Sequence, residues 1–173
     1  MSIPTIPPAP GAIRLPSPPG GGMTGAGLHI IDAFLNTIGP IKHVRGQLVV
    51  RKPPPVPRDT ATLLVEFANG VSGTIATIRA TPFFWRVHVF GDKGSAESVG
   101  EHELLLHKSN AKPERITLEP IDALRIELEA FADAIEGRVP FPVPTSDMLA
   151  TVTTFEAVIK ALESGETITL DTQ

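Results

Sequence analysis

The chain has 173 residues and a formal net charge of −4, with 15 lysines and arginines against 19 acidic residues and no cysteine. This length suits one domain with its own hydrophobic core. The acidic balance, without any basic cluster, argues against nucleic acid or an anionic membrane as a partner. Without cysteine the chain can form no disulfide, no zinc-thiolate site and no thiol nucleophile.

The first 19 residues are rich in proline, with seven prolines in "MSIPTIPPAPGAIRLPSPP". Proline removes a backbone donor and fixes φ, so residues 1–19 are predicted to form an extended arm. We expect residues 20–173 to form the folded domain. The start resembles no signal peptide and no apolar run is long enough to span a bilayer, so a cytoplasmic protein is expected.

Residues 26–38 are predicted to form a helix that Gly39-Pro40 terminates. Apolar residues recur there at intervals of three and four and form one stripe, which predicts a face packed on the core: Leu28, Ile31, Leu35 and Ile38.

Between Val44 and Glu119 the apolar period changes to two, which is typical of strands. Asn69-Gly70 predicts a two-residue hairpin, and Asp92-Lys93-Gly94 predicts a second turn. With a break at residues 110–113, the segment is expected to form an antiparallel sheet of about six strands.

Two helices are predicted after the strands, each with an apolar stripe: Leu124, Leu128, Phe131 and Ile135 in the first, and Met148, Val152, Phe155, Ile159 and Leu162 in the second. Gly137 and Gly165 stand where helix C-caps belong, and "TITL" can add a short final strand. The predicted fold is therefore α+β, an open, predominantly antiparallel sheet with helices packed on one face.

Gly20, Gly22 and Gly25 have the spacing of the dinucleotide-binding fingerprint. That fingerprint requires a strand before the glycines and an acidic residue about twenty positions later. Here "RLPSPP" precedes the glycines, and Lys42 and His43 stand near the acidic position. A glycine-rich turn that opens a helix is the favoured interpretation, and no cofactor-binding residue is assigned.

His29, Asp32 and Asn36 lie off the apolar stripe and can line one polar edge of the helix. Two ligands at positions i and i+3 do not hold a metal without a third, and no motif ties another histidine to them, so no metal site is predicted. A solvated helix face is the alternative interpretation of Asp32 and Asn36.

Gly20-Gly21-Gly22 followed by Gly27, His29 and Asp32 resembles the "GGGxLxDxGxHxxD" signature of the glucose-fructose oxidoreductase/inositol dehydrogenase (Gfo/Idh/MocA) family. "DTATLLVEFANGVSGTI", "VHVFGDKGSAE" and the segment from "ELEAFADAIEG" to "TITL" are similar to later parts of the family's C-terminal domain. The resemblance implies an enzyme with an N-terminal Rossmann domain for NAD(P) and an α+β domain for the substrate. By this resemblance the chain is expected to correspond to the second domain, without the first.

The resemblance also implies roles for particular residues. His29 matches the family's catalytic histidine and, with Asp32, is expected to bind the substrate. The family's catalytic aspartate falls on Gly25, and the lysine of its Glu-Lys-Pro motif has no counterpart. An ordinary surface or core-edge histidine remains the alternative for His29.

Two functions therefore stay open. The chain is either the substrate-binding and dimerisation domain of an NAD(P)-dependent oxidoreductase of sugars or polyols, inactive alone, or a stand-alone binding or scaffold module that has lost this chemistry. We expect no NAD(P) binding by the chain alone, a Rossmann partner in cis or in trans, and a homodimer formed through the open face of the sheet.

Overall fold

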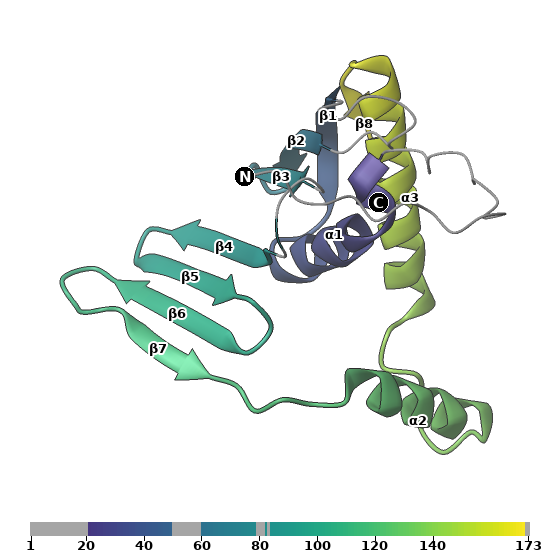
Figure 1. The fold of residues 1–173 in the computed structure, drawn as a ribbon. Helices are drawn as coiled ribbons and strands as arrows, with labels where there is room; N and C mark the ends of the chain where they lie inside the picture. Colours follow the sequence, from purple (N-terminus) through teal and green to yellow (C-terminus); the bar gives the residue numbers. More distant parts are fainter. Residues whose placement is uncertain (1–20, 50–59, 79–81, 83, 172–173) are drawn as a thin grey trace, which may run out of the picture.

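The computed structural model describes residues 21–49, 60–78, 82 and 84–171 (Figure 1). The amino-terminal arm expected at residues 1–19 lies outside the described residues. A 3₁₀ turn, η1 (Gly21–Thr24), precedes three helices: α1 (Ala26–Thr37), α2 (Ala123–Ile135) and α3 (Thr145–Ser164). All three helices begin and end close to the positions that the apolar periodicity predicts.

The described strands form two antiparallel sheets of four strands. Sheet A has the order β3-β2-β1-β8, and its strands are β1 (Ile41–Val49), β2 (Thr60–Phe67), β3 (Ser72–Ile78) and β8 (Ile168–Thr169). Sheet B has the order β4-β5-β6-β7, and its strands are β4 (Arg86–Gly91), β5 (Gly94–Val99), β6 (Glu103–Lys108) and β7 (Glu114–Thr117). The short final strand predicted in "TITL" is present as β8.

The α+β class and the antiparallel pairing are confirmed, whereas the expectation of one sheet of about six strands is corrected. β4 pairs with β5 and not with β3, so β3 ends sheet A and β4 starts a second sheet. A period of two tells which side of a strand a residue occupies, but it does not tell which strand lies beside it.

The core lies between one face of sheet A and helices α1 and α3. Leu63, Val65 and Phe67 of β2 are buried and alternate with exposed residues, as the period of two predicts. Ile31 from α1 and Val158 from α3 are fully buried against them. These side chains exclude water from the space between the two helices and sheet A. Their burial also fixes which side of α1 faces solvent.

Gly46 of β1 allows the close contact between α3 and sheet A. A Cβ at this position would stand 2.7 Å from Leu162 Cδ2 and 2.7 Å from Leu63 Cδ2. A larger residue would therefore push α3 away from the sheet, which explains a glycine in the middle of a strand.

The loop between β2 and β3 has four residues, 68–71, instead of the two predicted. Gly70 N–H donates to the Phe67 carbonyl, and Phe67 N–H donates to the Val71 carbonyl. Gly70 has φ +84°, but Asn69 is not left-handed. Asn69 Nδ2 instead donates to the Ile38 carbonyl at 2.9 Å, which ties the loop to the end of α1. The hairpin itself is confirmed.

The two faces of sheet B differ in chemistry. Residues that pair directly across the strands share a face. Seven residues of one face are mainly apolar: Val87, Val89, Ala96, Ser98, Leu104, Leu106 and Ile116. The ion pair of Lys108 and Glu114 lies at one end of the same face. On the other face the buried carboxylate of Glu97 forms an ion pair with Arg86 at 2.6 Å. Neither face of sheet B carries a well-packed helix within the described part of the chain.

Helix α2 stands apart from the two sheets and is joined to them by extended segments (Figure 1). It has no buried residue, and the side chains of its predicted apolar stripe are 55% to 70% exposed: Leu124, Leu128, Phe131 and Ile135. The helix therefore forms as predicted but its apolar stripe is not covered by the described residues.

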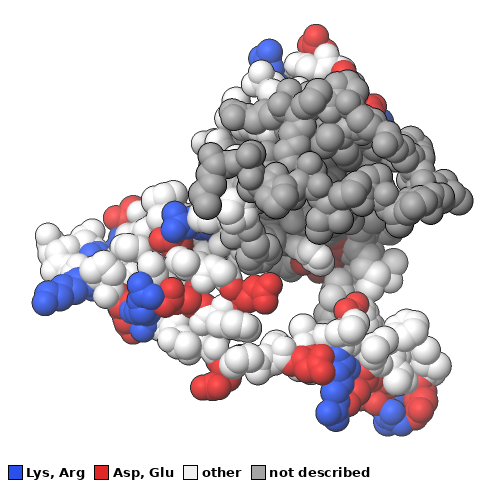
Figure 2. Space-filling model, viewed as in Figure 1, with Lys and Arg blue, Asp and Glu red and all other residues white. Residues whose placement is uncertain are grey.

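Charges of both signs are interspersed over sheet B and α2 on the face that Figure 2 shows. This face carries no broad positive patch among its described residues. None of the helices that the structure describes has the length and apolar content needed to cross a membrane.

Candidate functional site

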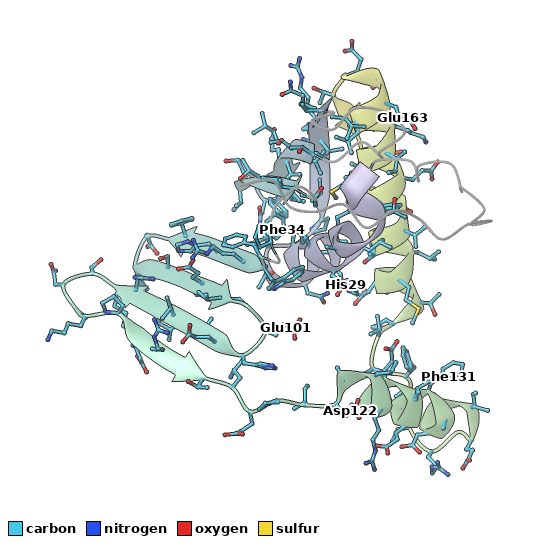
Figure 3. The ribbon with its side chains drawn as sticks, in the orientation of Figure 1. His29, Phe34, Glu101, Asp122, Phe131 and Glu163 are labelled. Carbon is cyan, nitrogen blue, oxygen red and sulfur yellow. The ribbon has the colours of Figure 1, made fainter. Side chains whose placement is uncertain are left out.

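Helix α1 presents His29 to solvent. Gly27 and Ile31 are the buried residues of this helix, and His29 lies two positions from each of them, on a different side. Its imidazole is exposed and forms no hydrogen bond or ion pair with the described residues. In Figure 3, His29 lies at the edge of α1 that is remote from the strands of sheet A. An exposed imidazole of this kind can exchange a proton with a bound molecule.

Asp32 lies one turn after His29 and faces helix α3. Its Oδ1 accepts hydrogen bonds from Asn36 Nδ2 at 3.2 Å and from Thr151 Oγ1 at 3.4 Å. Asn36 Nδ2 also donates to the Asp32 carbonyl at 2.9 Å. These contacts hold the Asp32 carboxylate where α1 crosses α3.

A small cavity of about 170 Å³ opens beside Asp32. Leu35 and Pro40 form its apolar side, and Asp147 and Thr151 line it from α3. The structure thus brings Asp32 together with two residues from α3 that the sequence did not single out. No local signal could have found Thr151, because it lies 119 positions from Asp32 along the chain.

The two expected site residues do not contact each other directly. His29 and Asp32 share one side of α1, and position 25 holds a glycine in place of a second acidic residue. Gly25 is the residue before α1, with φ −90°, and a Cβ there would meet no atom within 4 Å. A larger side chain can therefore occupy the position where the resemblance places an aspartate.

Metal ligands do not converge around His29. Within residues 21–49, 60–78, 82 and 84–171, no three His, Asp or Glu side chains are placed to hold a metal ion together. The described strands are all antiparallel, so this part of the chain contains no strand-helix-strand unit of the kind that delivers a glycine-rich loop to a dinucleotide.

The first half of α3 also carries exposed apolar side chains. Met148, Leu149 and Val152 of α3 are 41% to 61% exposed, whereas Val158 and Leu162 in the second half of the same helix are buried. Part of the predicted α3 stripe therefore packs on sheet A, and part of it remains open to solvent. An apolar surface of this kind is typical of a contact with another domain or subunit.

A family model described as the GFO/IDH/MocA C-terminal domain matches residues 4–97, more than half of the chain. No curated protein matches the chain. Solved structures do match it over most of its length, at sequence identities that establish the fold alone.

One is the aldose-aldose oxidoreductase of Caulobacter crescentus in complex with glycerol, with a TM-score of 0.72 and 18% identity; the match covers 87% of this chain and 48% of that one. Another is the WlbA dehydrogenase of Bordetella pertussis in complex with NADH and UDP-GlcNAcA, with a TM-score of 0.69 and 17% identity over 89% and 46% of the two chains.

A third is the UDP-N-acetylglucosamine 3-dehydrogenase GnnA of Acidithiobacillus ferrooxidans, with a TM-score of 0.70 and 23% identity over 80% of this chain and 46% of that one. The chain thus spans about half the length of the solved structures that it matches.

Proposed function

This chain belongs to the GFO/IDH/MocA oxidoreductase family, and we propose that it is the substrate-binding and dimerisation domain of an NAD(P)-dependent enzyme that oxidises a sugar or polyol. The observation that carries this proposal is His29, an exposed imidazole on α1, with the Asp32 carboxylate one turn away. His29 is the proposed catalytic residue, and Asp32 is proposed to bind the substrate.

The chemistry of the two side chains suits a polyol. Imidazole can accept the proton of a hydroxyl group while hydride leaves the carbon that bears it. The hydride acceptor would be the nicotinamide of NAD(P), which a nucleotide-binding domain must hold at reacting distance. The carboxylate of Asp32 can accept a hydrogen bond from a neighbouring hydroxyl and so orient the sugar.

The sugar or polyol class is also supported by the relatives. The solved structures include one enzyme in complex with glycerol and another in complex with NADH and a UDP-sugar acid. The small cavity beside Asp32 offers carboxylate, amide and hydroxyl groups, which are the partners that polyols use in place of water.

The nucleotide-binding domain is proposed to dock on the exposed apolar side chains of α2 and of the first half of α3. Leu128 and Phe131 of α2 and Val152 of α3 are more than half exposed. Burying such side chains against a second domain removes apolar area from water and would also fix α2 in place. This domain could lie on the same polypeptide or on another chain.

A homodimer is proposed to form through the apolar face of sheet B. On the corresponding outer face of sheet A, Leu64 is surrounded by polar neighbours such as Thr62, Glu66 and Arg45. The more apolar rows lie on sheet B instead. In one row Val87 pairs with Ser98, which pairs with Leu104, and in the next Val89 pairs with Ala96, which pairs with Leu106. A twofold contact between two such faces would cover both.

A stand-alone binding or scaffold module is the second candidate. Gly25 favours it, since no carboxylate stands four residues before His29 to orient the imidazole. The two candidates differ in one measurable property, because only the first predicts oxidation of a substrate once a nucleotide-binding domain is supplied.

The test measures NADH or NADPH formation with a panel of sugars, inositols and linear polyols. The chain is assayed alone and fused to the nucleotide-binding domain of a relative. We expect activity in the fusion only, a loss of about 10²-fold or more in kcat for His29→Ala, and a rise for Gly25→Asp.

The matched control is His102→Ala, which removes an exposed histidine of the β5–β6 loop and should leave activity unchanged. A folded fusion that binds NADH but oxidises no member of the panel would favour the scaffold module. Turnover by the isolated chain that His29→Ala abolishes would instead contradict the need for a second domain.

A further inference from the structure

A cavity of about 650 Å³ lies between sheet A and the first strand of sheet B. Its described lining comes from the end of α1, from β1, β2 and β3, and from β4. His29 and Asp32 are not among the lining residues. Its volume is in the range of cavities that bind small organic molecules.

Two opposite charges in this cavity have no charged partner among the described residues. Arg45 of β1 and Glu66 of β2 lie on neighbouring strands and on the same face, because Arg45 pairs with Leu64 and Glu66 pairs with His43. Diagonal neighbours of opposite charge often form an ion pair, as Arg86 and Glu97 do across sheet B at 2.6 Å. Here both charged groups remain available to a ligand.

Two imidazoles add hydrogen-bonding groups to the same cavity. His43 Nδ1 shares a hydrogen bond with Thr169 Oγ1 at 3.1 Å, and His88 Nε2 shares one with Ser95 Oγ at 2.9 Å. Each ring has a second nitrogen for which the described residues supply no hydrogen-bond partner. These contacts fix the orientation of both rings and leave one nitrogen of each for a ligand.

Apolar side chains line the rest of the cavity. Leu64 is 61% exposed, Val71 is 44% exposed and Phe90 is 74% exposed. The Phe90 ring stacks on His88 with 3.9 Å between the ring centroids, so its face is held in a defined position. A ligand with an apolar or aromatic group would cover these side chains, and this burial of apolar area would favour its binding.

We propose that this cavity binds a small zwitterion with an apolar or aromatic group, such as a free hydrophobic amino acid. The carboxylate of the ligand pairs with Arg45, and its ammonium group pairs with Glu66. The apolar group contacts Phe90 and Val71. Glu66 would repel a simple anion, and Arg45 would repel a simple cation. A zwitterion instead pairs with both residues. The site is separate from the proposed oxidoreductase site and does not depend on it.

The test uses three probes that share one aromatic body: L-phenylalanine, hydrocinnamate, which lacks the ammonium group, and phenethylamine, which lacks the carboxylate. Titration calorimetry on the chain at neutral pH gives the three affinities. We expect L-phenylalanine to bind about tenfold or more tightly than either analogue, since it makes both charge-assisted contacts.

Charge-removing variants then assign each contact. Arg45→Gln should weaken binding of L-phenylalanine and hydrocinnamate about tenfold and leave phenethylamine unaffected, and Glu66→Gln should weaken L-phenylalanine and phenethylamine only. The control is Arg125→Gln, which breaks the exposed ion pair with Glu129 on α2 and should change nothing. Circular dichroism checks that each variant is folded.

Three results would overturn the proposal. The first is no saturable binding of L-phenylalanine at millimolar concentration. The second is equal affinity for the three probes. The third is binding that Arg45→Gln and Glu66→Gln alter no more than Arg125→Gln does.

Discussion

Gly25 stands at the start of α1, where the helix dipole is positive and no side chain caps the free N–H groups. Gly25→Asp places a negative charge at this helix end, in space that holds no atom within 4 Å of the new Cβ. We expect the variant to raise the free energy of unfolding by about 0.3–1 kcal/mol, measured by urea denaturation.

Gly25→Asn is the matched control, because it adds a side chain of similar size without the charge. The stabilisation by aspartate should shrink as salt is added, whereas the effect of asparagine should not. An aspartate variant less stable than the asparagine variant at low salt would contradict this electrostatic account.

Gly46 is the residue that sets the spacing between α3 and sheet A. Gly46→Val would place methyl groups where Leu63 and Leu162 already meet. We expect a loss of about 1–3 kcal/mol or more in the free energy of unfolding, because a packed core accepts added volume poorly. Gln47→Val, at the next and exposed position of the same strand, should change stability by no more than about 0.5 kcal/mol.

Helices α2 and α3 both carry an apolar stripe, but the two stripes have different environments. Leu128 of α2 is 59% exposed and Leu162 of α3 is 5% exposed. Leu162→Ala should cost about 2–5 kcal/mol of unfolding free energy, and Leu128→Ala about 0.5 kcal/mol or less. Urea denaturation of the two variants side by side measures this difference.

Docking of a nucleotide-binding domain on α2 would change the expected effect of Leu128→Ala on stability. In the fused enzyme Leu128→Ala should become destabilising, since the side chain is then buried against the second domain. Equal and small effects of Leu128→Ala in the fused and isolated forms would contradict docking on α2.

On the scale of the whole molecule, the apolar face of sheet B predicts a dimer. Light scattering at micromolar concentration should give twice the mass of one chain. Leu104→Glu combined with Leu106→Glu should give a monomer, because four buried charges at a twofold contact would lack partners. Leu64→Glu, on the outer face of sheet A, is the control and should leave the dimer intact. A monomeric mass for the unmodified chain would contradict the prediction.

The isolated chain is also predicted to bind neither NAD(H) nor NADP(H) with micromolar affinity. Its glycine-rich stretch leads into η1 and α1, and its described strands form only antiparallel sheets. Titration calorimetry with NADH and NADPH measures this directly. Micromolar binding would show that a dinucleotide site exists outside the fingerprint geometry.

Much of the fold could be predicted from local patterns. The apolar spacing predicted α1 and most of its core face, although Leu28 of the predicted stripe does not pack on the core. The period of two predicted strands, and along β2 it matches the alternation of buried and exposed residues. The class of fold and the resemblance carried by His29 and Asp32 also came from the sequence. These features depend on periods of two and 3.6 residues, which a single segment contains in full.

Other features of the structure depend on contacts between segments that are distant in the sequence. β4 starts a second sheet, α2 keeps its apolar stripe in solvent, and Thr151 reaches Asp32 from 119 positions away. The cavity with Arg45 and Glu66 likewise needs β4 beside sheet A. The sequence by itself therefore determined which residues form each element and which side of it is apolar. Only the tertiary structure decided which apolar sides are covered and which polar groups converge, because both depend on contacts between segments that no local period records.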